Sequence, residues 1–137
     1  MASRAEDINR LLLRARNAMD RRYMEPLDLD HLAGLAHMAR SHFVREFRRV
    51  FGETPYRYLQ RRRVERAMFL LRHRADSVTD ICMAVGFTSL GSFSRMFSAI
   101  VGQSPSDYRA TARDEGAPAA PTYFVMRWTR PAGARRE

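Results

Sequence analysis

Two arginines occupy matching positions in a segment that the chain contains twice, and their side chains could bind an external partner. Residues 43–59 read FVREFRRVFGETPYRYL, and residues 93–109 read FSRMFSAIVGQSPSDYR. At about 100° per residue of a helix, Arg45 and Arg95 lie about 200° from the first phenylalanine of each segment, so they face outward. A guanidinium forms paired hydrogen bonds with a phosphate or with the edge of guanine. The same outward arginine in both copies predicts the same external contact in both.

The other identical positions belong to the elements that must hold these arginines. They are Phe43/Phe93, Phe47/Phe97, Gly52/Gly102, Pro55/Pro105 and Tyr58/Tyr108. The phenylalanines recur at helical spacing and predict a buried stripe. A glycine that ends one helix and a proline that begins the next are typical of helix boundaries. Packing therefore accounts for the repeated apolar residues but not for the repeated arginines.

A short capped helix precedes each copy, which makes each repeat a helix-turn-helix unit. Asp28 and Ser77 can each cap a helix, and the apolar residues after them match at an offset of 49 residues. The offset is 50 in the copied segment, which indicates one inserted residue in the turn between the paired helices. The pattern predicts an all-α fold at 5–110. Its parts are a first unit at 5–54, a linker helix at 55–73 and a second unit at 74–110.

The charge of the chain indicates the kind of partner. All 24 basic residues are arginine, and the formal net charge is +9. A strong positive field favours a polyanion, either nucleic acid or an anionic membrane surface. The helix-turn-helix units favour double-stranded DNA, because the second helix of such a unit fits the major groove. A linker helix of about 28 Å would let both units reach successive major-groove segments, which are about 34 Å apart.

Several other classes of protein are disfavoured. The sequence has no paired acids, nucleophile–base motif or cofactor loop, so we expect no enzyme activity and no cofactor. The single cysteine, Cys82, allows no disulfide within the chain, and the four histidines lack metal-ligand spacing. No apolar run could span a bilayer, and the polar N-terminus does not resemble a signal peptide. We therefore expect a cytoplasmic protein associated with the nucleoid.

These motifs resemble the DNA-binding domain of the AraC/XylS family of bacterial transcription regulators, over residues 5–110. The stretch SVTDICMAVGFTSLGSFSRMFSAIVGQSPSDYR at 77–109 is similar to the family signature, and RRRVERAMFLL at 61–71 is similar to its linker helix. The resemblance implies a domain of about seven helices in two helix-turn-helix units. It also implies a transcription regulator whose helices at 41–51 and 89–101 enter the major groove. Few residues precede the first helix, so a stand-alone form of the domain is expected.

The resemblance also implies which side chains contact DNA. It places base-reading residues at Ser41, His42, Val44, Arg45, Leu90, Gly91, Ser92 and Arg95. Four more residues, Arg40, Arg48, Arg49 and Ser89, complete the candidate DNA-binding set. Leu90 and Gly91 are apolar where the family often has polar residues. The second unit is therefore expected to form fewer side-chain hydrogen bonds with bases.

Other features allow more than one interpretation. The basic run at 61–63 could contact phosphate or remain solvated, and Arg63 could instead brace the two units. The composition of residues 111–121 predicts a linker. Residues 122–137 form the predicted tail, and apolar residues alternate along 122–129 as they do in a strand. That strand could fold back on its own domain or pair with a second chain, and we expect a monomer. RNA polymerase is an expected second partner, and the alternative function is an adaptor that binds RNA polymerase or another regulator.

Overall fold

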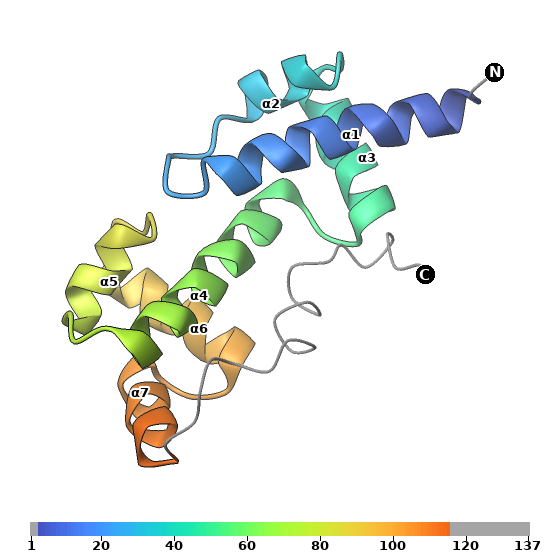
Figure 1. Cartoon of the computed structure of the whole chain (residues 1–137). Helices are drawn as coiled ribbons and strands as arrows, with labels where there is room; N and C mark the ends of the chain where they lie inside the picture. The colour runs from blue at the N-terminus through green and yellow to red at the C-terminus, as the bar shows by residue number, and fades with distance from the viewer. Residues whose placement is uncertain (1–2, 116–137) are drawn as a thin grey trace. The chain divides into compact units, whose positions relative to one another are not determined.

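Seven α-helices make up the part of the chain that this computed structural model describes, residues 3–115 (Figure 1). They are α1 (Arg4–Arg21), α2 (Leu29–Leu35), α3 (Arg40–Phe51), α4 (Pro55–His73), α5 (Val78–Ala84), α6 (Leu90–Val101) and α7 (Pro105–Asp114). No strand occurs between residues 3 and 115, and the predicted all-α fold is confirmed. The last helix was predicted to end near residue 110, but it continues to Asp114. The strand predicted at 122–129 lies outside the described residues.

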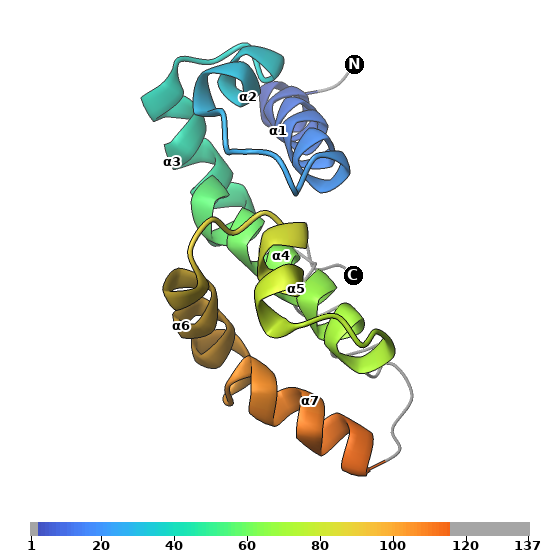
Figure 2. The same ribbon diagram turned by 90° about the vertical axis from the view of Figure 1, so that its left-hand side faces the viewer.

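The described residues form two compact units, and α4 contributes to both. Residues as far as Leu59 belong to the first unit, and residues from Gln60 belong to the second. The first turn of α4 therefore packs with the helices that precede it, and its remainder belongs with α5, α6 and α7 (Figure 2). The predicted linker helix is thus a structural part of each unit rather than a bare connector.

The core of the first unit fixes the position of α3. Helix α1 begins with a capping box, in which Ser3 Oγ accepts from the Glu6 N–H and the Glu6 carboxylate accepts from the Ser3 N–H. Its apolar stripe then packs against α2 and α3, with Leu12, Ala15 and Leu32 buried in the shared core. Because α3 is held by this core along one face, its opposite face is left for solvent or a partner.

The repeated aromatic residues form the same stack in both units. In the first unit the ring centroids of Phe43 and Phe47 are 5.7 Å apart, and those of Phe47 and Tyr58 are 5.8 Å apart. The equivalent rings of the second unit are 5.7 Å and 5.6 Å apart. Tilted and edge-to-face contacts at these distances are favourable for aromatic rings. All these rings are buried, which confirms that packing explains the repeated apolar residues.

The turn between the paired helices contains a left-handed residue in both units, but only the second unit uses glycine there. Gly86 has a φ of 104°, and its equivalent His37 has a φ of 56°. Glycine adopts this region freely, whereas a residue with a Cβ atom is strained in it. The turn is also longer in the second unit, where the N-cap of α6 is Ser89, than in the first, where the N-cap of α3 is Ala39. This difference is the insertion that the change of offset predicted.

Replacing His37 with glycine should raise the free energy of unfolding by about 0.5–1 kcal/mol, because it removes strain at an exposed position. Urea unfolding followed by circular dichroism would measure the change. The reciprocal variant Gly86→Ala is the control and should lower the free energy of unfolding by about 1–2 kcal/mol. A destabilised His37→Gly variant would contradict this account of the turn.

Two arginines of α7 donate hydrogen bonds to backbone carbonyl groups at and just beyond the C-terminal end of α4, in the second unit. Arg109 donates to the carbonyl oxygens of Leu71 and Asp76, at 3.2 Å and 2.6 Å. Arg113 and Arg109 both donate to the carbonyl oxygen of Arg74, at 2.7 Å and 3.3 Å. Carbonyl groups at a helix end carry partial negative charge, so guanidinium groups stabilise that end. Burial lowers the pKa of Arg109, and its role is structural.

Candidate DNA-binding surface

Helix α3 has one buried face and one exposed polar face. Phe43, Phe47 and Phe51 are buried on the first. The predicted site residues on the exposed face are Ser41, His42, Arg45, Arg48 and Arg49. Val44 differs from them, because it is half-buried and packs against the core. The exposed face therefore presents a row of guanidinium groups above a rigid aromatic core.

The arginines of α3 differ in whether an acidic side chain already binds them. Arg49 forms an ion pair with Glu46, with 2.9 Å between Nη2 and Oε1. Arg45 and Arg48 form no ion pair with any other residue in the range 3–115. A guanidinium that is bound to a carboxylate must exchange partners before it binds DNA. Arg45 and Arg48 are therefore the cations of α3 most available to an external anion.

Arg40, the first residue of α3, is held by α2. Its Nε and Nη2 donate to the two carboxylate oxygens of Asp30, at 2.9 Å and 2.8 Å. This hydrogen bonding lowers the pKa of the Asp30 carboxyl and raises the pKa of Arg40. Asp30 was not predicted as part of the site, because its pairing with Arg40 depends on how α2 and α3 are placed and no local pattern gives that. The pair orients Arg40 and neutralises part of its charge.

Helix α6 presents a less basic surface than α3. Ser89 caps the helix by accepting a hydrogen bond from the Ser92 N–H at 3.2 Å, whereas Ala39, the N-cap of α3, has no side-chain oxygen. The remaining predicted residues, Leu90, Gly91, Ser92 and Arg95, are all exposed. Every predicted site residue of the second unit therefore lies on the exposed side of α6, and Arg95 is its single cation.

Two arginines of the basic run at 61–63 form contacts within the second unit. Arg63 is 7% exposed, donates to the Gln60 Oε1 at 3.2 Å, and lies over the Phe87 ring at 5.8 Å from the centroid. Arg62 forms an ion pair of 2.7 Å with Glu65. These contacts of Arg63 lie within the second unit, and a guanidinium buried in this way cannot reach a phosphate. Bracing between the two units stays a prediction.

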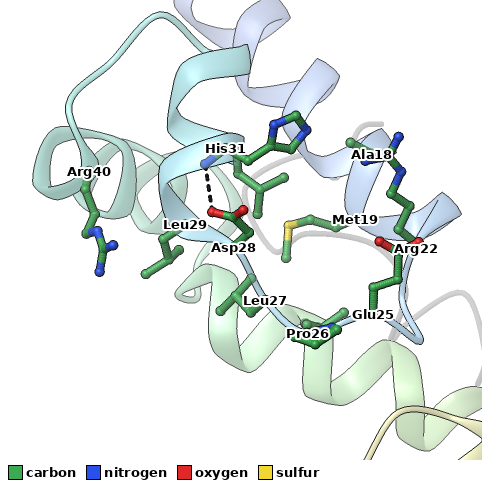
Figure 3. Close-up of a pocket in the computed structure, with 12 residues that line it drawn as sticks. Ala18, Met19, Arg22, Glu25, Pro26, Leu27, Asp28, Leu29, His31 and Arg40 are labelled. Atoms are coloured by element: carbon green, nitrogen blue, oxygen red, sulfur yellow. Dashed lines mark hydrogen bonds between the residues drawn. The ribbon is translucent and has the colours of Figure 1, made fainter.

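A cavity of about 640 Å³ lies beside the first turn of α2 in the first unit (Figure 3). Its apolar walls include Met19, Leu32 and Leu59, which are all buried. The polar residues of its wall are Arg22, Glu25, Asp28, His31 and Arg40. Asp28 caps α2 by accepting from the His31 N–H at 3.0 Å, as the sequence predicted. The rim mixes both signs of charge, so it favours no single class of ligand.

Other kinds of site find little support among residues 3–115. No three potential metal-binding side chains come together in this range. Over the same residues, no helix combines the length and apolar character that crossing a bilayer requires. Cys82 is buried, and burial raises the pKa of its thiol. A buried thiol of this kind is a poor nucleophile.

Comparisons with known proteins agree with this geometry. The sequence profile of a family described as "Helix-turn-helix domain" matches residues 32–111. The MmsAB operon regulatory protein of Pseudomonas aeruginosa is 36% identical over 87 residues, which cover 64% of this chain and 28% of that protein. The crystallised DNA-binding domain of AdpA, in complex with a target DNA, is 31% identical and has a TM-score of 0.72, over 77% of this chain and 95% of that one. An AraC-type regulator of Chromobacterium violaceum is 29% identical and has a TM-score of 0.69, over 76% of this chain and 93% of that one.

Two helix-turn-helix units, each with an exposed second helix, define a double helix-turn-helix protein. The chain belongs to the AraC-type helix-turn-helix family, as the resemblance of its motifs predicted. It spans 28% of the length of the MmsAB operon regulatory protein. The fold and the exposed helices are therefore shared with the family's DNA-binding domain, which covers only part of such a relative.

Proposed function

We propose that this chain is a sequence-specific, double-stranded DNA-binding transcription regulator. The observation that carries the proposal is the exposed face of α3, where Arg45 and Arg48 form no ion pair with any described residue. The second unit repeats the same outward arginine at Arg95. The net charge of +9 and the DNA-bound AdpA domain support the same conclusion. RNA polymerase as a second partner and a place at the nucleoid follow from this role.

In this proposal α3 and α6 each enter the major groove. Their N-terminal halves face the base edges, and the longer arginine side chains of α3 reach the phosphates on either side. Arg45 is the principal base-reading residue of the first unit, because an arginine binds the O6 and N7 atoms of guanine together. Arg48 and Arg49 lie farther along α3 and would bind phosphates. A single chain would thereby read two half-sites on one duplex.

The two half-sites should be read unequally. The second unit offers Arg95 and the exposed apolar side chain of Leu90, which could contact a thymine methyl group. Ser98 and Ala99 stand where the first unit has Arg48 and Arg49. Fewer charged contacts imply that the second half-site depends more on the shape of the DNA. Equally strong base preferences in both half-sites would argue against this assignment.

Binding to duplex DNA should weaken steeply as salt is added. Each phosphate that the protein neutralises contributes about −0.9 to the slope of log affinity against log salt concentration, so three to six contacts give a slope of roughly −3 to −5. Fluorescence anisotropy with a labelled duplex, between low and moderate salt, would measure this slope. The adaptor alternative predicts no such binding, and a flat salt dependence would therefore favour it over the groove-binding role.

A further inference from the structure

The guanidinium of Arg95 lies over a position that has no side chain. A Cβ atom added at Gly91 would be 3.3 Å from Arg95 Nη1 and 3.9 Å from Arg95 Cζ. The same atom would be 3.7 Å from Ser89 Oγ, and Arg95 Nη2 is 3.5 Å from Ser92 Oγ. The side chain of Arg95 is therefore folded back over the first turn of α6. It occupies the space that Gly91 leaves open.

The backbone does not require glycine at this position. Gly91 lies in helix α6, and it is not among the described residues with positive φ. Glycine within a helix is less stable than alanine, so local stability gives no reason for it. The equivalent residue of the first unit is Ser41, which carries a Cβ atom at the matching position, four residues before Arg45. The two arginines therefore match in sequence but have different neighbours on the preceding turn.

We propose that Gly91 is a positioning residue that sets the direction of the Arg95 guanidinium and so selects the base pair that Arg95 reads. This inference rests on the proposed DNA-binding function and concerns the second half-site. With Gly91, the guanidinium lies near the N-terminal turn of α6, the part of a recognition helix that faces base edges. A side chain at position 91 would displace it along the helix. Because base recognition by arginine depends on paired hydrogen bonds, such a displacement changes the preferred base pair.

The test compares base preferences by selecting duplexes from a random library with the full chain and its variants. Gly91→Leu should shift the preference at one or two base pairs of the second half-site and lower affinity for the wild-type site about tenfold, as expected for loss of a paired contact. Gly91→Ala should shift the base preference less than Gly91→Leu, because the end of the Arg95 side chain needs to move only slightly. Gly91→Ala should also raise the melting temperature, since alanine favours helix.

Two further variants separate positioning from a general structural effect. In an Arg95→Ala background, Gly91→Leu should change the preference much less than it does in the wild type, because only direct contact of the new leucine side chain with DNA would remain. Gly34→Ala is the matched control, since a Cβ atom added at Gly34 meets nothing within 4 Å. It should leave the selected sequences unchanged.

The outcomes distinguish this inference from the function on which it rests. Preferences that survive Gly91→Leu, or that change equally with and without Arg95, would overturn the positioning role while leaving DNA recognition intact. Wild-type protein that selects no sequence would overturn both.

Discussion

Replacing Phe47 with alanine should lower the free energy of unfolding by about 3–5 kcal/mol, because a large buried ring is removed from a packed core. Phe47 is fully buried at the centre of the first unit. Its ring centroid is 4.6 Å from that of Phe51, in an edge-to-face contact, and it also contacts the rings of Phe43 and Tyr58. The cavity left by alanine would remove all three contacts. Urea unfolding followed by circular dichroism measures the change.

Phe69 offers a control within the same chain. It is 43% exposed on α4 and contacts Arg66 and His73 at the surface. Phe69→Ala removes the same side chain from a partly solvated position. We therefore expect it to lower the free energy of unfolding much less than Phe47→Ala does. Equal losses for the two variants would show that the stack around Phe47 is not the centre of the core.

Replacing Arg45 with alanine should weaken binding to the selected DNA site by about 1–3 kcal/mol, because the proposed paired contact with a base edge would be lost. Its exposed position allows the change without loss of fold, since the opposite face of α3 carries the packing. Preference should relax at one or two base pairs of the first half-site. Anisotropy titrations against the selected duplex and its single-base variants would measure both effects.

Arg14→Ala is the matched control for this loss of charge. Arg14 is exposed on α1, about 200° around the helix from buried Leu12. The variant removes one positive charge away from α3, so it should reduce affinity slightly and equally for all sequences. If Arg14→Ala and Arg45→Ala weakened binding alike, without any change of base preference, Arg45 would be only one charge among many.

The features that could be predicted from the sequence depend on local periodicity. The phenylalanine stripes, the caps at Asp28 and Ser77, and the glycines that end α3 and α6 each follow from residues a few positions apart. Repetition strengthened these predictions, because each pattern occurred twice. The resemblance placed Val44 among the base-reading residues, but Val44 lies only about 100° around the helix from Phe43, near the edge of the buried stripe. A residue at such an edge can be exposed or packed, and Val44 is half-buried.

The features that could not be predicted depend on contacts between separate elements. The pair of Asp30 and Arg40 joins two helices, and the hydrogen bonds of Arg109 join α7 to the end of α4. Neither follows from periodicity, because each needs the distance between elements. The left-handed conformation of His37 became visible only in the structure, since histidine gives no sequence signal for that region as glycine does.

The exposed guanidinium groups of α3 also limit how this surface could be regulated. Cells often switch off a basic surface by acetylating lysine, which removes the positive charge. Every basic residue of this chain is arginine, so that modification has no side-chain target in it. Methylation of an arginine such as Arg45 would keep the charge but block paired hydrogen bonds. A covalent mark on this surface would therefore alter which sequence is chosen while leaving the attraction to DNA in place.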